Sequence, residues 1–310
     1  MTEAIIERLN SKKEELEERL GSLYHGGSNR RETLEYKIKK IEELIETYQF
    51  PYSNDLNLPE VKETLDQQIG FEEQKRIILE NLETEEIERF REQHNIPPKP
   101  PLILCFAGPP RIGKTSFAKI LAQALKREFF SINLAGLSDT SILTGTSENS
   151  SGIETGQLTR ALVETKTPNP VILLDEMDKT GSSFRNAIQD CLINILDPTQ
   201  NQEIIDYYLD VKLDFSQIVF VITANDLQKI SQPLRERMHI FELPGYTVEQ
   251  KKKIVQKIIQ EKFAPNEELQ DKLKITSEAL EVLISKTHEE GVRQLKSALE
   301  NRVFNYCLQK

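Results

Sequence analysis

The sequence predicts an α/β fold, with a doubly wound parallel sheet between an N-terminal helical hairpin and a C-terminal helical lid. Short apolar runs alternate with segments of helical spacing, as expected for parallel strands that are buried on both faces. Beyond residue 245 the spacing is helical only. The runs lie at 102–107, 129–134, 171–174 and 217–224, and we expect domains at 1–50, 51–245 and 246–310.

The first 48 residues show two helical stripes of apolar residues, separated by Gly26-Gly27. Asn29 and Glu32 have the spacing of a cap at the start of the second helix. Because the remaining faces are charged, the stripes need a covering surface, either the neighbouring domain or another chain. The stripes contain Ile5, Leu9, Leu16, Leu20 and Leu23, then Leu34, Ile38, Ile41, Ile45 and Tyr48.

A connecting segment precedes the first strand. A turn-rich linker at 51–59 leads to a helix from about Glu60 and another from Phe71 to about His94. The proline-rich segment 97–101 forms a stiff spacer. Farther along, we expect an exposed loop at 138–156 and helices at about 157–165 and 183–196.

Residues 108–115, GPPRIGKT, lie between the first apolar run and a helical stripe that begins at Phe117. They match G-x-x-x-x-G-K-[ST], a loop whose backbone N–H groups close around phosphate oxygens at a helix N-terminus. We expect Lys114 to bind the β- and γ-phosphates of ATP and Thr115 to bind Mg²⁺. A purely structural glycine turn is the alternative, and the flanking strand and helix argue against it. The expected cofactor-binding residues of this loop are Gly108, Pro109, Pro110, Arg111, Ile112, Gly113, Lys114, Thr115 and Ser116.

Asp175 and Glu176 end the run at 171–174. The carboxyl ends of parallel strands face the ligand crevice of an α/β sheet. We therefore expect Asp175 to bind Mg²⁺ and Glu176 to polarise the water that attacks the γ-phosphate. Acids at the start of a helix look the same, but the phosphate loop favours the nucleotide-site interpretation. Asn225 ends another buried run, where it holds the same water or simply forms a turn.

The composition narrows the range of partners. The chain has 310 residues, and its 50 acidic and 40 basic side chains give a net charge of −10, which argues against a dedicated nucleic-acid binder. No apolar stretch approaches membrane-spanning length, and the N-terminus lacks a signal-peptide core. Three cysteines and four histidines without metal-ligand spacing argue against zinc and thiol chemistry and favour a reducing, cytoplasmic location.

From Gly70 to about Asn301 the chain resembles the ATPase module of the Lon proteases, a branch of the AAA+ ATPases. The resemblance extends weakly upstream through LDQQIGFEEQKR. It implies a P-loop AAA+ core with a helical lid, and the hairpin is similar to the end of the family's N-terminal region. The carrying segments, in family order and spacing, are GPPRIGKTSFAKILAQAL, NPVILLDEMDK, LDPTQNQEIIDYYLDVKLDFSQIVFVITAN, PLRERM, LPGYT and EEGVRQLKSALE.

The resemblance implies roles that the residues alone do not. On chemistry alone, Arg237 and Arg293 are more simply surface arginines. By resemblance, Asn225 is sensor 1 and Arg293 is the sensor 2 arginine, which reaches the γ-phosphate from the lid. Arg237 is the arginine finger, which acts on the ATP of the next subunit. Ile69 and Gly70 fall where the family holds the adenine.

The chain also departs from the family pattern. It ends at Lys310, where the family continues into a proteolytic domain, and it offers no Ser–Lys dyad, so we expect no peptidase activity. Ser150-Ser151-Gly152 replaces the aromatic-aliphatic pair and glycine with which the family's pore loop grips substrate. Arg111 replaces a glycine of the phosphate loop, which is costly where φ is positive.

The sequence therefore predicts Mg²⁺-dependent hydrolysis of ATP to ADP by a Lon-like ATPase that remodels a protein partner. The resemblance implies assembly with itself in a head-to-tail ring, six-membered in the family. One alternative is a regulatory or scaffolding protein in which ATP switches assembly. Ser150-Ser151 favours that switch, whereas Glu176 and the sensor and finger residues favour turnover. Another alternative is the excised ATPase module of an ATP-dependent Lon-type serine protease.

Overall fold

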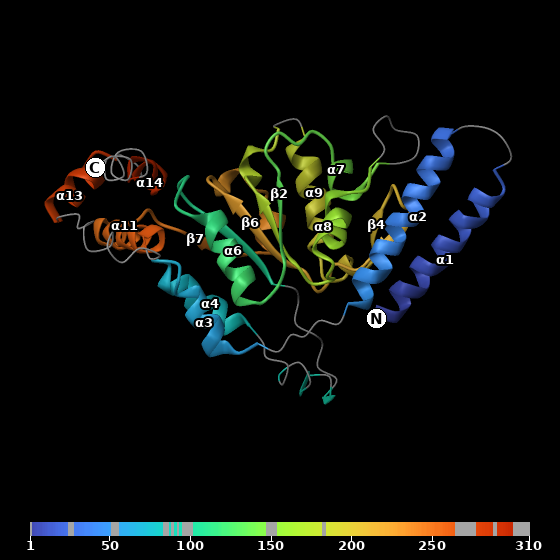
Figure 1. Ribbon diagram of the computed structural model, residues 1–310, viewed down its shortest axis with the longest axis horizontal. Helices are drawn as coiled ribbons and strands as arrows, with labels where there is room; N and C mark the ends of the chain where they lie inside the picture. Colours follow the sequence, from blue (N-terminus) through green and yellow to red (C-terminus); the bar gives the residue numbers. More distant parts are fainter. Residues whose placement is uncertain are drawn as a thin grey trace.

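The computed structural model of the chain has a central sheet, with the N-terminal hairpin at one end of the long axis and the C-terminal helices at the other (Figure 1). The C-terminal helices are α11 (Val248–Phe263), α13 (Ser277–Ser285) and α14 (Arg293–Ala298). The structure describes residues 2–23, 28–50, 56–82, 87, 90, 91, 93, 94, 102–146, 154–181, 184–263, 277–287 and 290–299.

The sheet has five parallel strands in the order β2-β3-β6-β1-β7, which confirms the predicted α/β fold. Each apolar run of the sequence forms one strand, but the sequence does not predict β7. This strand lies at the edge of the sheet, and only Phe241 of its four residues is buried, so it lacks a continuous apolar run. The strands are β1 Ile103–Ala107, β2 Phe129–Asn133, β3 Val171–Asp175, β6 Val219–Ala224 and β7 His239–Glu242.

Alternate residues of the inner strands enter two different cores, one on each face of the sheet. In β1, Ile103 and Cys105 belong to one core and Leu104 and Phe106 to the other. Helices α8 and α9 and the hairpin complete the first core, while α3, α4, α6 and the C-terminal helices complete the second. The helices around the sheet are α3 Leu58–Leu65, α4 Glu72–Asn81, α6 Lys114–Ala124, α8 Gln157–Thr165 and α9 Arg185–Ile195.

The N-terminal hairpin consists of α1 (Thr2–Gly21) and α2 (Ser28–Gln49), as predicted. Its apolar stripes share a core with one face of the sheet, so the neighbouring domain of the same chain covers them. Tyr48 adds a polar attachment at the end of α2. Its hydroxyl donates to the carbonyl of Asp214 at 3.0 Å and accepts from the N–H of the same residue at 3.2 Å.

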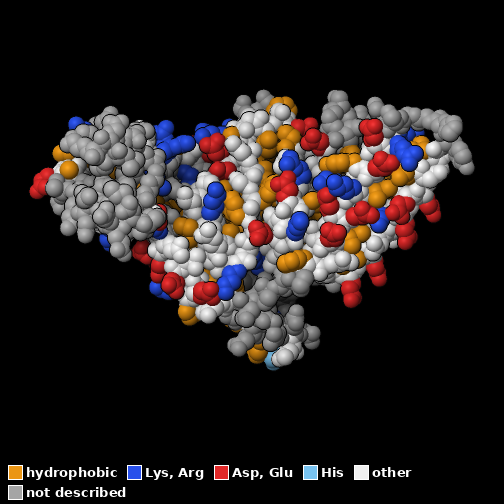
Figure 2. All heavy atoms as spheres, in the orientation of Figure 1, with side chains coloured by type: hydrophobic (Ala, Val, Ile, Leu, Met, Phe, Trp, Pro, Cys, Tyr) orange, Lys and Arg blue, Asp and Glu red, His pale blue; other side chains and the backbone are white. Residues whose placement is uncertain are grey.

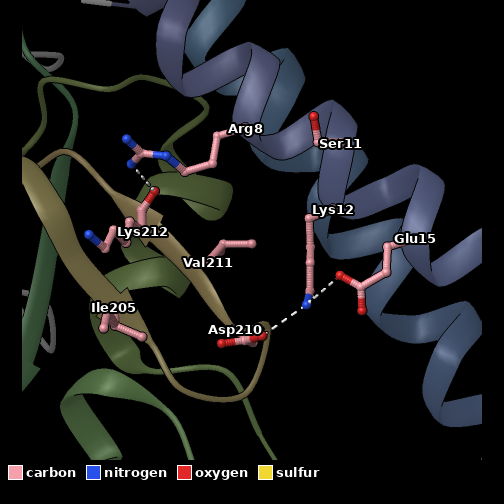
Figure 3. A pocket seen from close by; sticks show the side chains of 8 residues that line it. All are labelled: Arg8, Ser11, Lys12, Glu15, Ile205, Asp210, Val211 and Lys212. Carbon is pink, nitrogen blue, oxygen red and sulfur yellow. Dashed lines mark hydrogen bonds and ion pairs between the residues drawn. The ribbon is translucent and has the colours of Figure 1, made fainter.

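A small antiparallel β-hairpin also contacts α1; its strands are β4, Ile204–Asp206, and β5, Val211–Leu213. Lys12 Nζ lies 2.9 Å from a carboxylate oxygen of Asp210, and Arg8 donates to the carbonyl of Lys212 at 3.2 Å (Figure 3). These residues line a pocket of about 370 Å³ between α1 and the β-hairpin. The N-terminal hairpin is therefore held by ion pairs as well as by its apolar stripes.

Two sequence predictions were wrong. Residues 138–156 are not one exposed loop, because α7 (Ser141–Thr144) lies within them and Leu143 is fully buried. The helix predicted from Phe71 to about His94 is interrupted, because α4 ends at Asn81 and Leu82 has extended backbone with ψ 138°; the described residues 87, 90, 91 and 93 are helical again. Other predicted features lie outside the described residues: Gly26-Gly27, the side chain of Asn29, 51–55, the proline-rich segment 97–101 and Ser150-Ser151-Gly152.

The surface seen in Figure 2 carries acidic and basic side chains interspersed over the same elements. In the part of the chain that the structure describes, no helix is both long and apolar enough to cross a membrane.

Candidate nucleotide-binding site

The carboxyl ends of β1, β3 and β6 meet at one edge of the sheet, because these strands are parallel neighbours. Ala107 at the end of β1 pairs with Ala224 at the end of β6. The phosphate loop after β1, Asp175-Glu176 at the end of β3 and Asn225 after β6 therefore come together. Ligands of α/β sheets bind at this edge.

The phosphate loop changes direction through residues with positive φ: Gly108 at 149°, Arg111 at 69° and Gly113 at 93°. A Cβ on Gly108 would lie only 2.2 Å from the carbonyl oxygen of Leu243, so a larger residue does not fit there. Arg111 adopts the left-handed conformation, which costs a residue with a side chain about 1–2 kcal/mol. Arg111 therefore replaces the glycine of the family pattern at a position where a side chain raises the conformational energy of the backbone.

Lys114, the first residue of α6, points its ammonium group into the loop. Its Nζ donates to the carbonyls of Gly108 at 2.7 Å and Pro109 at 2.9 Å, and to Asn225 Oδ1 at 2.8 Å. The residue is 9% exposed, and burial lowers its pKa although nearby carboxylates oppose this effect. All three hydrogen-bond partners are neutral oxygens, so a bound phosphate would give this buried cation a directly bonded anion in addition to the nearby carboxylates.

Asp175 lies between two hydroxyl groups. Thr115 Oγ1 donates to one of its carboxylate oxygens at 3.2 Å, and the hydroxyl of Thr223 donates to the other. Hydroxyl and carboxylate oxygens suit Mg²⁺, which usually takes one or two carboxylates together with phosphate oxygens and waters. This donor set fits the predicted magnesium site at Thr115 and Asp175.

Glu176 follows in the left-handed conformation, with φ 60° and ψ 43°. Sparsely populated conformations of this kind cluster at functional sites. Its carboxylate accepts from Lys179 Nζ at 2.5 Å, in a pair that is open to solvent. Beside it, the buried carboxylate of Asp178 accepts from the N–H of Asn225 at 3.0 Å. Asp178 therefore holds the backbone of Asn225, whose side chain accepts a hydrogen bond from Lys114.

The lid meets the phosphate loop just before α14. The N–H of Val292 donates to the carbonyl of Arg111 at 3.2 Å, and a Cβ on Gly291 would lie 2.2 Å from the same oxygen. Arg293 follows as the first residue of α14, with an exposed side chain. The structure thus places the backbone of Arg293 next to the phosphate loop.

Ile69 and Gly70 lie where the phosphate loop and the segment at the start of α11 come close. Gly70 has φ 84°, and a Cβ there would lie 3.0 Å from Gln250 Nε2 and 3.6 Å from the ring of Tyr246. The hydroxyl of Tyr246 accepts from Gln68 Nε2 at 2.7 Å, and burial raises the pKa of Tyr246 to about 12. The predicted adenine residues therefore border a polar contact that links the segment before α4 to the segment before α11.

Arg237 lies apart from these residues. It precedes β7, whose first residue, His239, pairs with Leu104 near the start of β1, whereas the phosphate loop follows Ala107 at the other end. Its Nη2 donates to a carboxylate oxygen of Asp197 at 2.8 Å. The structure places Arg237 near the sheet edge opposite its own phosphate loop.

The sequence prediction missed Thr223, Asp178, Gln68 and Tyr246. A signal existed for two of them. Thr223 is the one hydroxyl side chain in the apolar run VFVITA, and Asp178 is a third acid two residues after Glu176. The contact between Gln68 and Tyr246 joins residues 178 positions apart, which no local pattern indicates.

A parallel α/β sheet with a phosphate loop after its first strand and a magnesium-type donor pair defines the class of P-loop ATPases. Residues 104–246 match the family described as "ATPase family associated with various cellular activities (AAA)". Among solved structures, the fold is similar to a closed-state cryo-EM reconstruction of Hsp104 with ATPyS and FITC casein. The TM-score is 0.63 at 19% identity, over 81% of this chain and 47% of the other.

The chain is also similar to part of several curated Lon proteases. The Lon protease of Campylobacter concisus is 45% identical over 200 residues, which cover 63% of this chain and 24% of the relative. The mitochondrial Lon protease homolog of Drosophila melanogaster is 37% identical over 251 residues, 80% of this chain and 24% of the relative. Residues 104–246 thus match the AAA family, and the chain is similar to part of these Lon proteases, of whose length it spans about a quarter.

Proposed function

We propose that this chain hydrolyses ATP in the presence of Mg²⁺ and uses the reaction to change the conformation of a protein partner. The cluster at the carboxyl edge of the sheet supports the proposal most directly. It joins Lys114, a buried lysine whose three hydrogen-bond partners are neutral oxygens, to the hydroxyl–carboxylate pair of Thr115 and Asp175. The free thiols of Cys105 and Cys191 agree with the cytoplasmic location that we propose.

Each residue has a task in this proposal. Lys114 exchanges its carbonyl partners for phosphate oxygens of ATP. Glu176 releases Lys179 and polarises the attacking water, which Asn225 orients. Arg293 contacts the γ-phosphate from the lid. Mg²⁺, held by Thr115 and Asp175, would neutralise charge on the phosphate oxygens.

The position of Arg237 supports action on a neighbouring subunit. Because β1 and β7 are parallel, Arg237 before β7 and the phosphate loop after β1 lie at opposite edges of the sheet. A finger that cannot reach its own nucleotide requires a head-to-tail contact, which closes into a ring or extends into a helix. We propose a ring, and six subunits is the number found in the family.

Two variants test the proposal. Lys114→Ala should abolish ATP binding, measured by titration calorimetry, and should retain the wild-type circular dichroism spectrum. Glu176→Gln should bind ATP normally but hydrolyse it about 10²–10⁴-fold more slowly, because the amide cannot accept the proton of the water. ATP binding by Lys114→Ala with unchanged affinity would contradict the phosphate-loop assignment. Full turnover by Glu176→Gln would remove that residue from its role.

A second candidate is an ATP-dependent assembly switch that does not thread a polypeptide. Ser150-Ser151 favours it, because hydroxyl side chains offer little apolar grip. We expect casein to stimulate the ATPase weakly or not at all. Strong stimulation that is lost on mutation of this loop would favour a threading motor instead.

A further inference from the structure

The guanidinium of Arg237 is held at two points. Its Nη2 donates to Asp197 at 2.8 Å, and its Nη1 donates to the carbonyl of Pro233 at 3.3 Å. The side chains are 31% and 18% exposed in the ion pair, whereas several other ion pairs of the structure, such as Arg76–Glu73, are more than half exposed. Solvent therefore screens the Asp197–Arg237 pair less than a typical surface pair.

The carboxylate of Asp197 is also held by hydrogen bonds from its own turn. The N–H and the hydroxyl of Thr199 both donate to Oδ1, at 2.8 and 2.7 Å, and Oδ2 remains for Arg237. The two bonds from Thr199, with the bond from Arg237, lower the pKa of Asp197 to about 2, so the carboxylate is charged at neutral pH. Its orientation comes from its own turn, independently of the arginine.

Helix α9, which precedes the turn containing Asp197, also holds the segment that carries Arg237. Gln189 of α9 donates to the carbonyl of Lys229 at 2.8 Å and accepts from the N–H of Ser231 at 2.6 Å. These bonds fix the entry to α10 (Gln232–Arg235). Helix α9 and the turn after it thus hold both the beginning of this segment and its arginine.

We propose that Asp197 is a positioning residue that orients the Arg237 guanidinium toward the ATP of the neighbouring subunit. The inference rests on the proposed function, in which Arg237 acts between subunits. Arginine has five N–H donors, and the two used here leave others for a phosphate. A held side chain has already lost rotamer freedom that a free one would lose on each turnover. Asp197 acts only through Arg237.

The test compares Asp197→Ala, Arg237→Ala and the double variant, at saturating ATP and at protein concentrations where the wild type is assembled. We expect Asp197→Ala to lower kcat about 10–100-fold, since misplacement by about 1 Å costs up to that factor. KM for ATP and the sedimentation profile should stay unchanged. Asp197→Ala should cause no further loss when Arg237 is already alanine. Asp190→Ala, an exposed acid on α9, is the matched control.

Mixing subunits adds a readout that a general structural defect would not give. Asp197→Ala subunits keep Glu176, and Glu176→Gln subunits keep a held finger, so the mixture should recover activity that neither has alone. Should Asp197→Ala fail to fold, Thr199→Val, which removes one of the two bonds that fix the carboxylate, should lower kcat with the same dependence on Arg237.

Three results would separate the possible failures. Full turnover by Asp197→Ala, where Arg237→Ala is inactive, would overturn the positioning role and leave the finger in place. Losses that multiply in the double variant would show that Asp197 acts by another route. Full activity of Arg237→Ala would instead contradict the proposed action of Arg237 between subunits, and it would leave ATP hydrolysis itself to the tests at Lys114 and Glu176.

Discussion

Asp206 is a buried carboxylate that joins three segments. It is 2% exposed. One oxygen accepts from the N–H groups of Tyr208 and Leu209 at 3.0 Å, and the other accepts from Gly156 N at 3.0 Å and from the hydroxyl of Thr159 at 2.5 Å. Burial raises the pKa of Asp206, although all four donors oppose the rise. A single side chain thus connects the turn after β4, the start of α8 and the residue before it.

The raised pKa of Asp206 predicts a pH dependence of stability. Above about pH 3.9, the ordinary aspartate value, the native state holds this proton more tightly than the unfolded chain, so this group lowers the free energy of unfolding as pH rises. Asp206→Asn cannot titrate, so we expect the stability difference in favour of the wild type to shrink as pH rises above about 3.9. Urea unfolding of both proteins measures it, with Asp190→Asn as control. A difference that grows with pH would mean that the four hydrogen bonds outweigh burial.

Among the helices and strands, the sequence predicts those whose formation depends on their own local composition. The inner strands are continuous apolar runs because both faces are covered, and the two hairpin helices follow from their stripes. Strands β4 and β5 have three residues each and β7 has four, and these short strands form because a partner strand is present. Pairing of this kind leaves no pattern in a single short segment.

In the candidate site, too, the sequence predicts the residues of a local motif but not the contacts between distant segments. A local motif indicates Lys114 and Thr115, because the phosphate loop must fold on itself. The contact of Thr223 with Asp175 joins residues 48 positions apart, and that of Lys114 with Asn225 spans 111. Both contacts depend on the strand order, which the sequence alone leaves open. The roles of these residues remain predictions until the variants are measured.

In the whole molecule, the N-terminal hairpin and the C-terminal helices pack on different faces of the sheet and differ in their contacts with the candidate site. The C-terminal helices share a core with α6 and contact the phosphate loop through Val292 and Arg111. The N-terminal hairpin shares a core with the opposite face of the sheet and is fixed at Tyr48. Nucleotide binding between the loop and the lid would therefore act first on the C-terminal end.

The sheet topology predicts that turnover depends on assembly. From His239 to Glu242, β7 spans about 10 Å, and Arg237 lies beyond its start, so a single chain cannot bring this guanidinium to its own γ-phosphate. A finger from another subunit contributes about 10³–10⁵ in rate to related P-loop enzymes. We therefore expect the ATPase rate per chain to rise steeply with protein concentration, in parallel with a larger species in sedimentation. Arg237→Ala should abolish this rise but retain ATP affinity, and Arg235→Ala serves as the neighbouring control. A rate that does not change with concentration, measured on a sedimenting monomer, would mean that the site completes itself within one chain.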